Sequence, residues 1–96
     1  MNWDIPVFSV EEGNRRHSAI REIMRSRAVD CLIIAGHIGI YKGAAADIRY
    51  VSNYCMWFDD EYVVFPLAGE PVLYVWSKIH ADWAEKISWR TSIRLP

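Results

Sequence analysis

Apolar and polar residues alternate with helical spacing near the start of the chain and predict a helix over Ser9–Ala28. Ser9 and Glu12 fit a capping box, in which the hydroxyl accepts a backbone hydrogen bond and the carboxylate reaches back. The apolar stripe of this helix is formed by Ile20, Ile23 and Met24. We therefore expect an amphipathic helix that starts at Ser9.

The next apolar run, Cys31–Ala35, is short and does not alternate. Such a run is typical of a strand that is buried on both faces, in a parallel or central position with helices above and below it. Cys31 is then expected to be a buried thiol that behaves as a small apolar residue. The sequence after the run predicts a loop over His37–Gly43 and a short helix over Ala44–Ser52.

A hairpin is predicted by two runs rich in Val, Tyr, Phe and Trp, Tyr62–Pro66 and Val72–Trp76, which a Gly-containing loop connects. Ser77 is the expected cap of a further helix, and Trp89–Leu95 resembles the start of another strand. The buried face of that helix is expected to consist of Ile79, Trp83 and Ile87.

This order of elements predicts a single α/β domain over residues 1–96, with a mixed sheet flanked by helices. The last expected strand only begins near the end of the sequence, so the sheet lacks a neighbouring strand at that edge. We therefore expect a domain that is incomplete at its C-terminus, either as a fragment or as a chain completed by a partner.

Composition narrows the class of protein. Hydrophobic residues make up 52% of the chain and aromatic residues 14%, which favours a folded core over disorder. Because the 11 Lys and Arg residues are balanced by 12 Asp and Glu residues, the chain is not strongly basic and we expect no nucleic-acid partner. The first residues do not resemble a signal peptide, and no apolar run is long enough to span a membrane. We expect a cytoplasmic protein without a membrane partner.

The candidate groups for chemistry do not form a recognisable site. His17, His37 and His80 lack the spacing of metal ligands, and Asp59–Glu61 is interpreted as a solvated turn. The glycines after the first strand do not match a phosphate-binding loop. Cys55 has no base near it in the sequence. We therefore assign no catalytic residue and no metal ligand to this chain.

The segment Tyr50–Phe58 is unusually rich in aromatic and sulfur-containing side chains and lies between regular elements. Two interpretations remain open. The segment fills the core as a plug, or it forms a binding or interface surface, where aromatic residues are enriched.

Two stretches resemble the N-terminal domain of the creatinase, prolidase and aminopeptidase P family, the M24 metallopeptidases. They are Asp-Ile-Arg-Tyr-Val-Ser-Asn-Tyr over residues 47–54 and Phe-Pro-Leu-Ala-Gly-Glu-Pro-Val-Leu over residues 65–73. The leading helix and strand occur in the matching order, so the resemblance extends from Phe8 to about Ile87.

The resemblance implies a ribonuclease H-like mixed sheet that precedes a larger catalytic domain, the "pita-bread" domain, which residues 1–96 do not include. In this family that second domain carries the ligands of a divalent metal, here expected to be Mn, Co or Zn. Relatives hydrolyse Xaa-Pro peptides or act on creatine and other small substrates. The resemblance therefore implies a non-catalytic domain of an Xaa-Pro peptidase-like hydrolase, without a cofactor of its own.

The resemblance also implies a role in a homodimer, where this domain closes part of the partner's active site. It suggests Trp57, Phe58 and Asp60 as residues that contact the partner's substrate, and Tyr54, Trp57 and Phe58 as interface residues. The family has a cationic side chain near the position of Asp60, so an acid here would suit a substrate amine. The alternative is a free-standing α/β module that only binds or dimerises.

Overall fold

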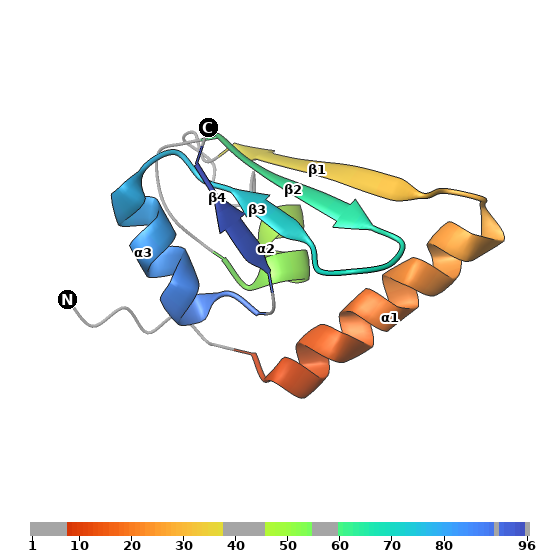
Figure 1. Ribbon diagram of the computed structural model, residues 1–96. Coiled ribbons are helices and arrows are strands. Elements are labelled where there is room, and N and C mark those ends of the chain that lie inside the picture. Colours follow the sequence, from red (N-terminus) through yellow and green to blue (C-terminus); the bar gives the residue numbers. More distant parts are fainter. Residues whose placement is uncertain (1–7, 38–45, 55–59, 90, 96) are drawn as a thin grey trace.

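The computed structural model describes residues 8–37, 46–54, 60–89 and 91–95 (Figure 1). In chain order its elements are α1 (Val10–Ser26), β1 (Cys31–His37), α2 (Ala46–Ser52), β2 (Asp60–Pro66), β3 (Val72–Tyr74), α3 (Lys78–Ile87) and β4 (Ser92–Arg94). The predicted order of helices and strands is therefore confirmed.

Within these residues, four strands form one sheet in the order β1-β2-β3-β4. The pairs β1–β2 and β2–β3 are antiparallel, and β4 lies parallel to β3. The predicted mixed sheet flanked by helices is confirmed. The hairpin is also confirmed, although β3 ends at Tyr74 and not at Trp76.

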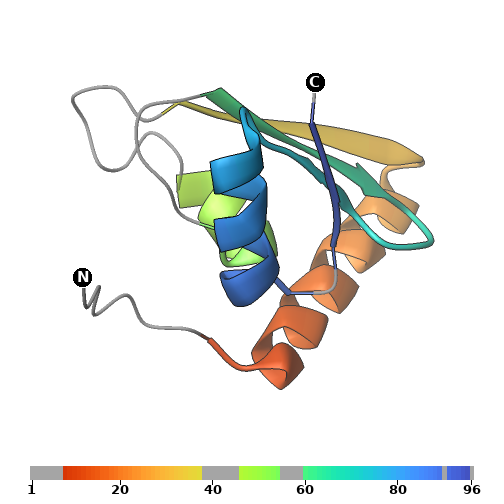
Figure 2. The same cartoon turned by 60° about the vertical axis from the view of Figure 1, so that its left-hand side comes forward.

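All three described helices lie on the same face of the sheet (Figures 1 and 2). They contribute to one hydrophobic cluster, because Met24 of α1, Val51 of α2 and Ala84 of α3 join it together with Phe65 and Leu73 from the strands. No described element covers the opposite face. This one-sided arrangement decides which strand residues are accessible.

Helix α1 begins as the sequence predicts. Ser9 is its N-cap, and the Ser9 hydroxyl accepts a hydrogen bond of 3.1 Å from the Glu12 backbone N–H. The Glu12 carboxylate accepts hydrogen bonds from Arg15 and Arg16 along the helix. Of the predicted stripe, Met24 is buried, whereas Ile23 is exposed.

The prediction of a central strand at Cys31 is wrong. β1 lies at the edge of the sheet, continues beyond Ala35 to His37, and pairs antiparallel with β2. Its side chains alternate between core and solvent, so Cys31 is exposed and Ile33 is 75% exposed. An apolar run without alternation cannot reveal that helices cover only one side of it.

The predicted face of α3 is only partly correct. Ile87 is buried with Ala84, but Ile79 is 73% exposed. Ser77 occupies the N-cap position, where its side chain makes no capping bond to the backbone. The Ser77 hydroxyl instead lies 2.6 Å from Nδ1 of His80.

Candidate interaction surface

The residues predicted to form the interface do not share one environment. Tyr54 is 1% exposed and belongs to the core cluster, so its assignment to an interface is wrong. Trp57 and Phe58 lie outside the described residues. Asp60 is the first residue of β2, and its backbone is paired with that of His37.

The end of α2 explains why Tyr54 is buried. Asn53 adopts a left-handed conformation, with φ of 63°, that Asn tolerates better than most residues. Its side-chain amide donates to the Ile87 carbonyl over 2.9 Å, which fixes α2 against the end of α3. The Tyr54 N–H donates to the Ser52 hydroxyl, and the chain therefore turns inward at this point.

An exposed apolar area that the sequence pattern did not indicate lies on the face of the sheet opposite the helices. Directly paired residues on neighbouring strands point to the same face. The register therefore aligns Ile33, Val64 and Val72 in one row, and Ala35, Tyr62 and Tyr74 in the next. We call this surface the open face; it consists of Cys31, Ile33, Ala35, Tyr62, Val64, Val72 and Tyr74.

The open face is accessible along most of its length. Tyr62 is 46% exposed and Tyr74 is 38% exposed, beside the more exposed Ile33. Arg94 of β4 is the residue aligned with Tyr74, so a charge stands only at the β4 side of this row. Contiguous apolar surface of this kind is typical of sites that bind another protein surface.

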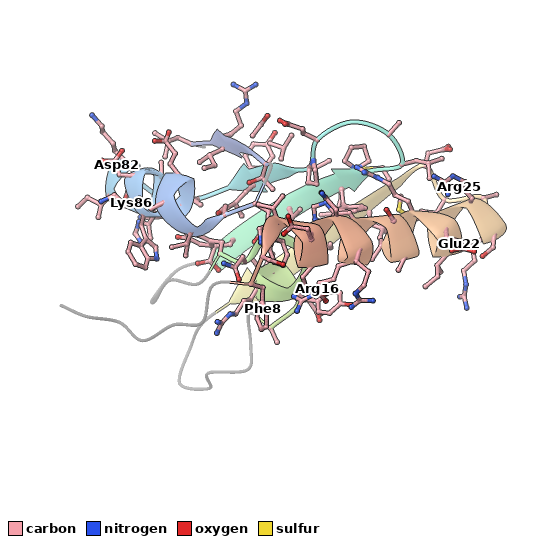
Figure 3. All side chains as sticks on the ribbon, turned by 90° about the horizontal axis from the view of Figure 1, so that it is seen from below. Phe8, Arg16, Glu22, Arg25, Asp82 and Lys86 are labelled. Carbon is pink, nitrogen blue, oxygen red and sulfur yellow. The ribbon has the colours of Figure 1, made fainter. Side chains whose placement is uncertain are left out.

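Apart from the open face, a cluster of polar side chains is buried at the N-terminal half of α1. In this cluster, Arg16 lies among aromatic rings. The Arg16 guanidinium carbon lies 4.4 Å from the ring centre of Tyr50, 4.6 Å from that of Phe8 and 5.3 Å from that of Trp89. Figure 3 shows Phe8 and Arg16 together at this end of the helix. Cation–π contacts and a hydrogen bond of 3.1 Å to the Tyr50 carbonyl hold this side chain in place.

His17 occupies the neighbouring position in the core. Its Nε2–H donates to the Val51 carbonyl over 2.6 Å, and its ring meets those of Phe65 and Trp89 edge-on. Burial lowers the pKa of His17, against the opposing effect of the Val51 carbonyl. This histidine therefore joins α1 to α2 and is not displayed for chemistry.

Glu12 completes the cluster on the solvent side. Hydrogen bonds from Arg15 first, and then from Arg16, lower the pKa of its carboxyl to about 2. The carboxylate is thus charged at any physiological pH and orients Arg16 toward the aromatic rings. The signal in the sequence was a charged residue, Arg16, on the inward side of an otherwise apolar helical face.

The described residues contain no group of three or more His, Cys, Asp or Glu side chains that could hold a metal ion. Among the helices that the structure describes, none has the length and apolar character required to cross a membrane.

Comparison with known proteins supports the fold. Neither a protein-family model nor a curated protein sequence matches the chain. The chain is similar in structure to the dipeptidase PepE from Mycobacterium ulcerans, with a TM-score of 0.66 and 15% sequence identity. The match covers 94% of this chain, which spans only 24% of the length of that dipeptidase.

Proposed function

We propose that the chain is the non-catalytic N-terminal domain of an M24-type, metal-dependent hydrolase that acts on Xaa-Pro peptides. The observation that carries this proposal is the asymmetric coverage of the structural match. Nearly all of this chain is similar to a quarter of a dipeptidase. The two stretches over residues 47–54 and 65–73 resemble the N-terminal domain of the M24 metallopeptidases, and this resemblance gives independent support.

In this proposal the chemistry belongs to a second domain. The described residues do not fit a metal site, so a divalent Mn, Co or Zn ion would be held by ligands outside them. This domain would contribute to dimerisation and close the active site of the partner subunit. Trp57, Phe58 and Asp60 remain the candidates for contact with the partner's substrate, with the carboxylate of Asp60 suited to an amine.

The first experiment examines the gene. We expect the reading frame that encodes residues 1–96 to continue into a region that supplies Asp, His and Glu ligands. The full product is then purified with and without residues 1–96 and assayed on Xaa-Pro dipeptides in the presence of Mn. We expect the deletion to remove activity and residues 1–96 alone to hydrolyse nothing.

A metal analysis provides the matching control. After dialysis, residues 1–96 should retain no stoichiometric transition metal, because a tight site needs several ligands in fixed geometry. One tightly bound Mn or Zn per chain would contradict the proposal.

The second candidate is a free-standing module that binds or dimerises without an enzymatic role. The observation that favours it is the open face, which would serve such a module as well as it would serve a larger enzyme. A stop codon after residue 96 followed by unrelated sequence would favour this candidate over the first.

A further inference from the structure

Among the described residues, no strand pairs with the outer edge of β1, so this edge offers a row of backbone groups to a further strand. The Leu67 N–H donates to the Asp30 carbonyl over 2.9 Å, and these two residues continue the β1–β2 register. In an antiparallel pair, hydrogen-bonded residues alternate with residues whose backbone groups point away. The β1 residues whose backbone N–H and C=O groups point away from β2 are therefore Cys31, Ile33, Ala35 and His37.

This edge lacks the features that usually prevent strands from associating. Natural edge strands are short, charged, interrupted by proline or bent by a bulge. β1 has seven residues, none of them Asp, Glu, Lys, Arg or Pro, and it pairs with β2 without a bulge. The edge at β4 is different, because that strand has three residues and one of them is Arg94.

We propose that β1 pairs antiparallel with β1 of a second copy of this chain, so that the sheet and its open face continue across the two subunits. The inference deepens the dimerisation part of the proposed function and rests on that part alone. It names the surface that brings the two subunits together.

One register uses the whole strand. With Ile34 on the two-fold axis, Cys31 lies opposite His37 of the partner subunit, and Ile33 lies opposite Ala35 of the partner subunit. Each outward-pointing residue then meets another, which gives about eight hydrogen bonds across the axis. Pairing two copies of β1 brings no like charges together. A two-fold contact uses the same surface of both subunits, so that surface must be complementary to itself. These features favour a second copy as the occupant.

The first test is a pair of matched substitutions. Ile33→Lys places a charge on the β1 edge, whereas Ile79→Lys places the same charge on α3, at an isoleucine of nearly equal exposure. In sedimentation velocity across a concentration series, we expect a dimer for the wild type and for Ile79→Lys. Ile33→Lys should raise the dimer dissociation constant by at least about tenfold. Circular dichroism melts check that both variants are folded.

The second test fixes the register and does not depend on the first. Positions 31 and 37 of opposite subunits would lie about 5.5 Å apart between Cα atoms, within the range of a disulfide. Mild oxidation of His37→Cys, made together with Cys55→Ser so that Cys31 is the only other thiol, should therefore produce a covalent dimer. Neither Cys55→Ser alone nor His37→Cys combined with Cys31→Ser and Cys55→Ser should do so, because identical positions lie far apart in this register.

The outcomes separate the edge from dimerisation itself. A dimer that survives Ile33→Lys and yields no cross-link would overturn the β1 edge and leave dimerisation in place. A wild type that is monomeric at every concentration would overturn both. If β1 amides of such a monomer resist hydrogen exchange, another strand of the same chain occupies the edge, and the proposal falls.

Discussion

On one face of the sheet, Val63, Phe65 and Leu73 are completely buried, whereas on the other face Ile33, Tyr62 and Tyr74 are open to solvent. Both sets are apolar, and both alternate along the same strands. The difference arises because the three described helices all pack on the first face (Figure 2). An apolar strand residue in this protein therefore packs into the core on one face and is exposed to solvent on the other.

The largest expected effect comes from placing the same charge on each face. Leu73→Asp should unfold the domain or cost at least about 4 kcal/mol, because it buries an unpaired carboxylate. Ile33→Asp should change the free energy of unfolding of the monomer by less than about 1 kcal/mol, since its side chain remains in water. Urea unfolding followed by circular dichroism compares the two. Loss of the cooperative transition in Ile33→Asp would mean that something covers the open face.

A smaller effect is expected where α1 meets the rest of the core. A Cβ at Gly13 would lie 2.7 Å from Cδ2 of Trp89, so Gly13→Ala must displace the indole ring. We expect a loss of about 1–3 kcal/mol from this overpacking. Asn14→Ala, one position along on the exposed side of the helix, is the matched control and should be neutral or slightly stabilising. Thermal melts that show equal losses for both would contradict this packing.

The covered side should also be sensitive to pH through His17. Its pKa is lower in the folded state than the ordinary value of 6.5, so the unfolded chain binds the proton more readily. The stabilisation from neutral His17 is complete above pH 6.5 and is lost as the pH falls below that value toward the folded-state pKa. We expect the urea concentration at the midpoint of unfolding to decrease as the pH is lowered from 7.5 to about 5.5. His17→Gln should flatten this dependence.

The smallest effect on stability is expected for Trp57→Ser combined with Phe58→Ser. Both residues remain candidates for a surface presented to a partner subunit, so their loss should weaken self-association and preserve the melting temperature. Sedimentation and calorimetry measure the two quantities on one sample. A large drop in melting temperature would identify the segment as a plug in the core.

Tyr54 illustrates where a sequence pattern misleads. Its aromatic neighbours, and its place between regular elements, were equally consistent with an interface and with a core plug. The left-handed backbone at Asn53, together with hydrogen bonds from Asn53 to Ile87 and from Tyr54 to Ser52, turns this side chain inward. Local sequence does not encode a contact with a residue 34 positions away, so this choice required the folded chain.

The sequence by itself determined the elements of this protein and their order. Ser9 starts α1 because a hydroxyl at an N-cap satisfies a backbone N–H, and β-branched and aromatic runs form the β2–β3 hairpin. These are local effects, which act over a few residues and are visible in the printed sequence.

Only the tertiary structure decided which sides of those elements meet. Cys31 and Ile33 are apolar residues in an apolar run, yet they face solvent because the helices gather on the other side of the sheet. Arg16 is charged, yet it is buried because Phe8, just before α1, and Tyr50 and Trp89, from distant segments, converge on it. Burial depends on which surfaces the whole chain brings together, and hydrophobicity at one position does not specify its neighbour in space.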